Sequence, residues 1–276
     1  MKINTIAIPS FNAAGKPNPN LTLIHGWAAE SRVWESWVQE YFSPHYSIIL
    51  VDLPGCGESD EITNNSNLLE DWLLAIEKVI PEKTHLLGWS LGGLIAQQIA
   101  LRNPDKIQSL ICLASTPRFT QNDGWKKSVS PKIINDFIQA VSIEAGKTLK
   151  QFWRLQLQGV SNSRSLMKSL VEHMSQRSVP SLKTLNQGLR LLKDMDNRQA
   201  IKNLNMPTLW LLGEHDPLIP QDIRESLPKL QPQAHIEVLA DGSHIPFFSK
   251  PQETAQAILD FLRQQATPPM PPQENP

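Results

Sequence analysis

Gly88-Trp89-Ser90-Leu91-Gly92 lies where one hydrophobic pattern gives way to another. The apolar pair before it, at 86–87, is typical of a buried strand, and residues 91–99 repeat with helical periodicity. Glycines two residues either side of Ser90 permit a turn so sharp that a side chain there would clash with the adjoining strand and helix. The sequence therefore predicts a serine on a strand-to-helix turn, with its hydroxyl pushed out of the sheet.

Short apolar runs alternate with helix-like segments over much of the chain. The runs are 21–24, 47–51, 85–87, 110–113, 208–212 and 236–239. The helical candidates are 33–41, 68–79, 91–102, 220–227 and 252–263. This alternation predicts an α/β fold with a mostly parallel central sheet flanked by helices.

The alternation stops between about residues 116 and 206. Amphipathic stretches with a 3.6-residue period follow one another there, at 133–141, 149–153, 166–171 and 182–192. We expect a helical cap, 118–193, inserted into a core made of residues 1–117 and 194–265. The proline-rich tail, 266–276, is expected to be disordered or extended.

Composition narrows the class of protein. With 40% hydrophobic and 19% charged residues the 276-residue chain is typical of a soluble globular protein. It has no apolar run long enough to span a bilayer and no export signal at its N-terminus, so we expect a cytoplasmic monomer with no membrane contact. Cys56 and Cys112 offer neither a disulfide framework nor a metal-ligand spacing, so no metal and no cofactor are expected. Nucleic-acid binding has no supporting motif.

A serine hydroxyl is a poor nucleophile unless a base takes its proton and a third group orients that base. His244 lies in the loop between the last strand run and the final helix, and Asp216 lies in a turn-rich loop after the run at 208–212. The chain order of serine, acid and histidine fits a serine on a strand-to-helix turn. We therefore expect Ser90 to be the nucleophile, His244 the base and Asp216 the orienting acid.

Other residues compete for these roles. Glu214 and Asp222 share the loop region of Asp216 and are its alternatives. Four other histidines fit the role of base less well, because they lie on or before strands or on a cap helix: His45, His85, His173 and His235.

The first strong strand run is followed by His25-Gly26-Trp27. Negative charge that develops on a substrate oxygen needs preorganised donors, commonly backbone amides. The amide of Trp27, with that of Leu91 just after the nucleophile, is the expected oxyanion hole.

Five motifs together carry a resemblance: His25-Gly26-Trp27, Gly88-Trp89-Ser90-Leu91-Gly92-Gly93-Leu94, Ala114-Ser115-Thr116-Pro117-Arg118-Phe119, Asp123-Gly124-Trp125 and Asn186-Gln187-Gly188-Leu189. On these residues the chain resembles the α/β-hydrolase family over almost its whole length. Within that family it is most similar to the esterases of biotin synthesis that act on the methyl ester of a pimeloyl chain bound to acyl-carrier protein.

The resemblance implies an α/β-hydrolase fold with Ser90, Asp216 and His244 as the catalytic triad. It also implies an acyl site beside the nucleophile. The residues expected to bind substrate are Trp27, Trp89, Phe152, Trp153, Arg154, Leu155 and Gln156.

Charge is unevenly distributed along the chain. Residues 118–193 carry 13 Lys and Arg against 4 Asp and Glu, a net charge of +9, whereas the rest carries −10. A basic surface speeds encounter with an acidic partner. The resemblance implies that an acidic acyl-carrier protein docks at Lys147, Arg164 and Lys168. Gln151 replaces a fourth basic residue there, with Lys150 and Arg154 nearby.

The expected reaction is attack by Ser90 on the ester carbonyl of a methyl-capped dicarboxylyl chain, loss of methanol and hydrolysis of the acyl-enzyme. Two alternatives stay open. One is another serine hydrolase of the same fold, either a general short-chain carboxylesterase or a carbon–carbon bond hydrolase. The other is a small-molecule binding protein that turns over slowly.

Overall fold

The computed structural model describes residues 1–63, 66–161, 163–175 and 179–266. Within these residues seven strands form one sheet in the order β1-β3-β2-β4-β5-β6-β7. Neighbouring strands are parallel, except that β1 runs antiparallel to β3. The strands are β1 (Thr5–Ile8), β2 (Asn20–Ile24), β3 (Ser47–Val51), β4 (Thr84–Trp89), β5 (Ile107–Leu113), β6 (Thr208–Gly213) and β7 (His235–Leu239).

All six predicted apolar runs lie in strands, which confirms the mostly parallel sheet. Every residue of β4 and of β6 is buried, as expected for central strands covered on both faces. The sequence did not predict β1, Thr5–Ile8. This strand forms the edge of the sheet and alternates exposed with half-buried residues, so it lacks the continuous apolar run of the other strands.

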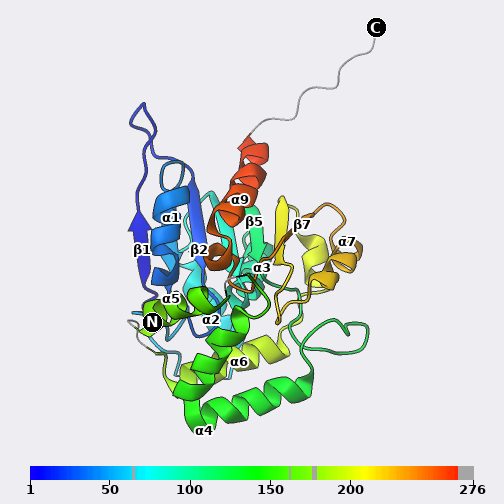
Figure 1. Ribbon diagram of the computed structural model, residues 1–276. Helices are drawn as coiled ribbons and strands as arrows, with labels where there is room; N and C mark the ends of the chain where they lie inside the picture. The colour runs from blue at the N-terminus through cyan, green and yellow to red at the C-terminus, as the bar shows by residue number, and fades with distance from the viewer. Residues whose placement is uncertain (64–65, 162, 176–178, 267–276) are drawn as a thin grey trace.

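Helices flank the sheet on both faces (Figure 1). α1 packs with α9, and α2 packs with α3. The helices of the α/β core are α1 (Glu35–Tyr41), α2 (Leu68–Glu77), α3 (Leu91–Arg102), α7 (Leu227–Leu230), α8 (Pro246–Ser249) and α9 (Pro251–Ala266). Short 3-10 turns lie at Ser31–Trp34, Ala200–Asn203 and Gln221–Glu225.

The prediction of one continuous core helix at 220–227 is wrong. The structure has a 3-10 turn at Gln221–Glu225 and then the single turn of α7. Pro228 explains the break, because a proline lacks the N–H that an unbroken helix needs and can occupy only its first turn.

Three longer helices lie together below the sheet in the view of Figure 1: α4 (Pro131–Gln156), α5 (Ser163–Ser175) and α6 (Leu182–Asp194). The two amphipathic stretches predicted at 133–141 and 149–153 are the two limbs of α4. The helix is interrupted at Glu144, whose φ of −148° and ψ of 71° are not helical. Thr148 bridges the interruption, since its hydroxyl lies 3.1 Å from the carbonyl oxygen of Ala140 and 2.9 Å from that of Glu144.

Isolated bridges join the segments that lead into and out of these helices. Arg118 pairs with Asp196, and Thr120 pairs with Val129. The boundaries of the cap, 118–193, stay a prediction. The predicted tail lies outside the described residues apart from Ala266. No helix in the described ranges is long and apolar enough to cross a membrane.

Candidate active site

Ser90 occupies the turn between β4 and α3. Its φ of 55° is a conformation that residues with side chains rarely adopt. Two hydrogen bonds hold it there: its amide donates to the Leu113 carbonyl at 3.1 Å, and the Ser115 hydroxyl donates to its own carbonyl at 2.8 Å. The neighbouring strand β5 therefore stabilises the strained turn.

The flanking glycines have the role that the sequence predicts. A Cβ on Gly88 would meet the backbone of Gly92, and a Cβ on Gly92 would meet the carbonyl oxygens of Ile24 and His25. Any side chain at either position would force strand β4, helix α3 or strand β2 to move.

Ser90 lies at one end of a chain of hydrogen bonds. Its Oγ is 3.0 Å from Nε2 of His244, and Nδ1 of His244 is 2.7 Å from Oδ2 of Asp216. The other carboxylate oxygen of Asp216 accepts from the amides of Leu218 and Ile219 at 2.8 and 2.9 Å. Because a carboxylate only accepts, Nδ1 of His244 carries the proton and Nε2 is free to accept from the serine.

Water is largely excluded from this chain of hydrogen bonds. The side chains of His244 and Asp216 are 1% and 0% exposed, and Ser90 is 8% exposed. The structure thus brings the three residues together in the order in which a proton would move from serine to base.

The alternative acids lie elsewhere. A carboxylate oxygen of Glu214 accepts from the amide of Asp241 at 2.8 Å, and Asp222 pairs with Lys127 at 3.3 Å. Of the alternative histidines, His235 lies 3.6 Å from Glu237 in β7, and the side chain of His173 lies outside those that the structure describes. His85 bonds the hydroxyl of Ser109 at 2.8 Å, and burial lowers its pKa to about 4.

The predicted oxyanion donors belong to segments that adjoin Ser90. Gly26 lies so close that a Cβ on it would be 3.2 Å from Cβ of Ser90. Leu91 is the first residue of α3, so its amide points out of the helix with no helical carbonyl in reach. Within the described residues the Trp27 amide donates no hydrogen bond. Both amides are available to an oxygen bound at the serine.

Two tryptophan indoles fasten the loops of the site, which the sequence did not reveal. Nε1 of Trp89 donates to the carbonyl of His244 at 2.8 Å. Nε1 of Trp27 donates to the carbonyl of Leu185 in α6 at 2.9 Å. Gly188, one turn further along α6, is packed so closely that a Cβ would lie 2.6 Å from Cδ1 of Trp27. The α6 helix and the expected oxyanion segment are therefore held together.

A cavity lies beside Ser90, and apart from this serine the side chains that line it are apolar. Its eleven apolar members come from the Trp27 segment, from both limbs of α4, from α6 and from the connecting segments: Trp27, Phe119, Val129, Ile133, Ile134, Phe137, Phe152, Leu155, Leu189, Leu192 and Leu218. Phe137 and Phe152, one from each limb of α4, meet the Trp27 ring at centroid distances of 5.5 and 5.0 Å. The kink at Glu144 thus lets one helix form two walls.

The predicted substrate-binding set divides in two. Trp27, Phe152 and Leu155 line the cavity. The other four do not line it in the described structure, because they point elsewhere: Trp89, Trp153, Arg154 and Gln156.

The reasons for these differences are local. Trp89 packs behind Ser90 against Phe247 and bonds the His244 backbone. Trp153 and Gln156 are buried between elements, and the Gln156 carbonyl accepts from the His244 amide at 3.2 Å. Conversely, Ile133, Ile134 and Phe137 line the cavity although their apolar periodicity is typical of core residues, so they could not be recognised from the sequence.

The expected docking residues are exposed. Lys147 lies on the second limb of α4, and Arg164 and Lys168 lie one turn apart on α5. Arg164 shares an open groove with Arg154 and Gln151. Lys147 pairs with Glu144 at 3.4 Å. This groove and the apolar cavity share Leu155, so the two adjoin at that residue.

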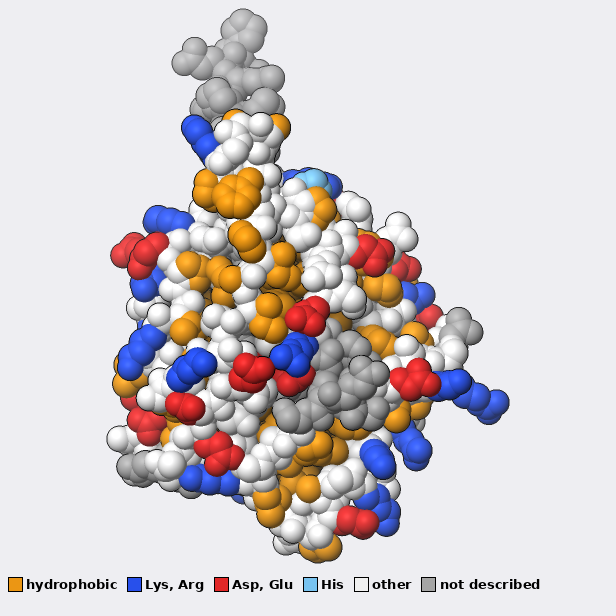
Figure 2. All heavy atoms as spheres, turned by 90° about the vertical axis from the view of Figure 1, so that its left-hand side faces the viewer, with side chains coloured by type: hydrophobic (Ala, Val, Ile, Leu, Met, Phe, Trp, Pro, Cys, Tyr) orange, Lys and Arg blue, Asp and Glu red, His pale blue; other side chains and the backbone are white. Residues whose placement is uncertain are grey.

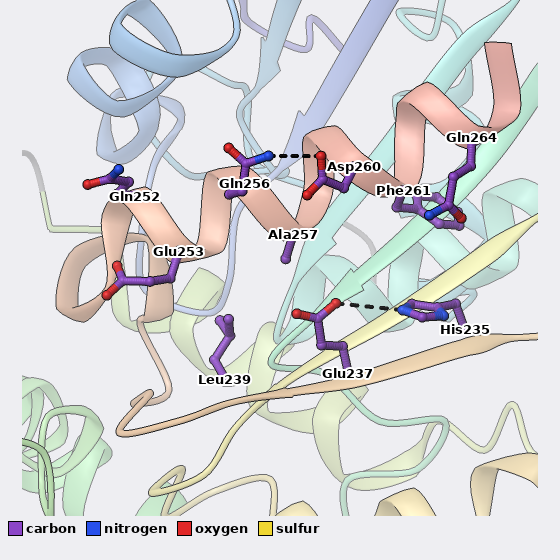
Figure 3. Close-up of a pocket in the computed structure, with 10 residues that line it drawn as sticks. All are labelled: His235, Glu237, Leu239, Gln252, Glu253, Gln256, Ala257, Asp260, Phe261 and Gln264. Atoms are coloured by element: carbon purple, nitrogen blue, oxygen red, sulfur yellow. Dashed lines mark hydrogen bonds and ion pairs between the residues drawn. The ribbon is translucent and has the colours of Figure 1, made fainter. Parts of the chain in front are cut away.

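A separate groove lies between β7 and α9 (Figure 3). His235 and Glu237 of β7 are 3.6 Å apart there, and Gln256 donates to Asp260 within α9 at 2.8 Å. The groove contains no residue of the serine site. Among the described residues no three His, Cys, Asp or Glu side chains gather as metal ligands. Burial raises the pKa of both cysteine thiols, so neither is a reactive thiolate.

Comparisons with known proteins agree with the fold described above. A model of the alpha/beta hydrolase fold family matches residues 19–251. Proteins named pimeloyl-[acyl-carrier protein] methyl ester esterase, from Salmonella typhi and Salmonella enteritidis among others, are 36% identical over 245 residues, covering 89% of this chain and 94% of theirs.

Solved structures share the fold at lower identity. An esterase from Exiguobacterium antarcticum superimposes with a TM-score of 0.81 at 21% identity, covering 95% of each chain. MenH from S. aureus does so with a TM-score of 0.75 at 18% identity, covering 97% of this chain and all of that one.

Proposed function

Since this chain belongs to the alpha/beta hydrolase fold family, we propose that it is a serine esterase that hydrolyses the methyl ester of a pimeloyl chain carried by acyl-carrier protein. The products are methanol and the free carboxylate on the carrier, and the reaction is a step of biotin synthesis. The hydrogen-bonded series of Ser90, His244 and Asp216, opening on an apolar cavity, is the observation that carries this proposal. The names of the 36% identical relatives supply the substrate class.

The first half of the reaction forms an acyl-enzyme. Nε2 of His244 takes the proton of Ser90 as Oγ bonds to the ester carbonyl carbon, and the carbonyl electron pair moves onto its oxygen. The amides of Trp27 and Leu91 donate to that oxyanion. When the pair returns to re-form the carbonyl, the methoxy group leaves with the proton from His244 as methanol. Asp216 stabilises the imidazolium that exists in between.

The second half releases the product. Water loses a proton to Nε2 of His244 and adds to the acyl carbon, and the same two amides hold the oxyanion. Its collapse breaks the bond to Oγ of Ser90, which recovers a proton from His244. The residues end as they began, so no cofactor is consumed.

The lining of the cavity supports a substrate with a polymethylene arm. Eleven apolar side chains offer no polar partner along the arm, and burial of each methylene contributes about 0.8 kcal/mol. The cavity therefore favours an aliphatic acyl group over a polar one.

The charge of the cap supports the carrier as partner. We propose that residues 118–193 act as a basic cap on which an acidic acyl-carrier protein docks, through Lys147, Arg164 and Lys168, with Arg154 compensating for Gln151. Figure 2 shows Lys and Arg side chains gathered at the lower right of one face, at the end of the molecule that α4–α6 occupy in Figure 1. The groove of Arg154 and Arg164 and the apolar cavity share Leu155, and we expect the carrier's arm to enter the cavity beside this residue.

The first experiment compares rates on methyl pimeloyl carrier protein, on free dimethyl pimelate and on p-nitrophenyl acetate. We expect kcat/KM to be highest on the carrier substrate and Ser90→Ala to abolish turnover of all three. Equal rates on the carrier and free esters would favour a general carboxylesterase. A phosphonate that fails to label Ser90 would favour a binding protein. Growth without biotin of a strain that lacks its own esterase tests the pathway.

The second experiment tests docking. Charge reversal at Arg164 and Lys168 should lower kcat/KM on the carrier substrate by about tenfold or more at low salt, because electrostatic steering sets the encounter rate, and leave p-nitrophenyl acetate unaffected. A matched reversal at the exposed Lys202 and Lys229, outside the cap, is the control. Equal loss on both substrates contradicts docking at this surface.

A further inference from the structure

The imidazole of His25 lies buried between two loops next to the nucleophile. Its Nδ1 is 2.8 Å from the carbonyl oxygen of Gly26, and its Nε2 is 3.0 Å from the amide nitrogen of Leu53. Both ring nitrogens are therefore engaged with backbone atoms. The ring cannot turn without breaking both contacts.

The partners fix which nitrogen holds the proton. A carbonyl oxygen only accepts and an amide only donates, so Nδ1–H donates to Gly26 and the bare Nε2 accepts from Leu53. Burial lowers the pKa of His25, although the charge of Asp52 and the bond to Gly26 oppose the shift. The ring is neutral and held in a single tautomer.

The Leu53 contact anchors the ring to a rigid loop. The carboxylate of Asp52, the preceding residue, accepts from the amides of Ser31 and Glu58 at 2.6 and 3.1 Å and from the side chain of Asn4 at 2.8 Å. These bonds fix the position of the Leu53 amide, which in turn fixes the ring plane of His25.

The Gly26 contact sets the direction of the next peptide unit. In a planar trans peptide the C=O and N–H point in opposite directions. The carbonyl of Gly26 points at the His25 ring, so the amide of Trp27 points away from it. Gly26 itself abuts Ser90, and within the described residues the Trp27 amide has no hydrogen-bond partner.

We propose that His25 is a positioning residue for the reaction, which holds the Gly26–Trp27 peptide so that the Trp27 amide faces the oxyanion at Ser90. The inference rests on the proposed function, since it assumes that an oxyanion forms there. Its Nδ1–H bond orients the donor, and its Nε2 bond anchors the ring. A second, longer contact from the Ala29 amide reaches the same Gly26 carbonyl at 3.4 Å and is too weak to replace the ring.

Two variants separate the two bonds of the ring. Asparagine places an amide N–H near the position of Nδ1, so His25→Asn keeps the donor to Gly26 and loses the acceptor for Leu53. Glutamine places its amide near Nε2, so His25→Gln keeps the acceptor for Leu53 and loses the donor to Gly26. Each variant deletes one buried hydrogen bond, and urea unfolding measures whether the two are equally stable.

The assay is hydrolysis of p-nitrophenyl acetate, with urea unfolding and inhibition by a trifluoromethyl ketone measured alongside. Because loss of an oxyanion donor costs about 100- to 1,000-fold in kcat, we expect misorientation in His25→Gln to lower kcat by about 10- to 100-fold with KM within about twofold. The inhibition constant of the ketone, which forms an oxyanion on Ser90, should rise by the same factor as kcat/KM falls. In His25→Asn most of kcat should return.

Equal losses of kcat in the two variants, or a ketone inhibition constant that does not follow kcat/KM, would overturn the role of His25. The ketone measurement can be made on whichever variant folds. If wild type and Ser90→Ala hydrolyse the ester equally, the proposed function fails instead. The two failures are thereby distinguished.

Discussion

The bond from the Trp89 indole to the His244 carbonyl can be tested by a single substitution, Trp89→Phe. The change removes a 2.8 Å hydrogen bond but keeps an aromatic ring next to Ser90, where it packs against Phe247 at a centroid distance of 5.1 Å. Among the described residues, the backbone of His244 would then keep one hydrogen bond, from its amide to the Gln156 carbonyl at 3.2 Å.

The expected loss follows from the burial of that carbonyl. Leaving a buried carbonyl without its donor costs about 1 to 3 kcal/mol, so the free energy of unfolding should fall by that amount in addition to the packing loss. If about 1 to 2 kcal/mol of this stabilisation holds His244 in reach of Ser90, kcat should fall by about 5- to 30-fold. KM should change little, because Trp89 does not line the apolar cavity.

Trp34→Phe is the matched control. Trp34 is buried in the same aromatic cluster, 6.0 Å from Trp89 between ring centroids, and its Nε1 has no hydrogen-bond partner among the described residues. Both substitutions replace a buried indole by a smaller ring, so both lose packing. The difference between their losses in unfolding free energy and in kcat is therefore the contribution of the Trp89 hydrogen bond. Urea unfolding and kcat on p-nitrophenyl acetate measure it. Equal losses in the two variants would refute the reasoning.

Three further outcomes are expected. Gly188→Ala should lower kcat/KM by about tenfold, because its Cβ would lie 2.6 Å from the Trp27 indole that holds the oxyanion segment. Gly146→Ala is the control: its Cβ would have nothing within 4 Å, so the free energy of unfolding should rise by about 0.5 to 1 kcal/mol. Asp216→Asn should lower kcat at least about 100-fold and Asp222→Asn should leave it within about threefold, as steady-state kinetics can show. His85, with a pKa of about 4 folded and about 6.5 unfolded, binds its proton more readily when unfolded, so its stabilisation is complete above pH 6.5 and is lost toward pH 4. In wild type the free energy of unfolding should be lower at pH 5 than at pH 7.5. This difference should be about 2 kcal/mol smaller in His85→Gln.

The central sheet was predictable because its strands are buried on both faces. A continuous apolar run such as 208–212 is compatible with few structures other than a buried strand. The glycines around Ser90 locate the turn that follows β4. The edge strand β1 was not predicted, since its four residues alternate exposed with half-buried positions and form no continuous apolar run.

The positions of Ser90, Asp216 and His244 could be inferred from chain order, because loops after parallel strands converge on one edge of the sheet. Chain order could not separate Asp216 from Asp222. That distinction depends on which carboxylate reaches the imidazole, and it follows from the amides of Leu218 and Ile219, which fix the carboxylate of Asp216.

The walls of the cavity were the least predictable part. Apolar residues at helical spacing look the same in sequence whether they face a packed core or an empty cavity. Phe137 and Phe152 belong to different turns of the pattern and meet because α4 bends at Glu144. Gly146 lies two residues after the bend, but a single glycine in a helical pattern does not by itself predict one. The bonds of Trp89 join residues 155 positions apart, beyond any local signal.

The apolar cavity beside Ser90 also bears on how turnover ends. Hydrolysis turns a neutral ester into a carboxylate, and none of the side chains that line this cavity carries a positive charge to pair with it. We therefore expect the free acid to bind more weakly than the ester. Weak rebinding of the acid would keep inhibition by the product low.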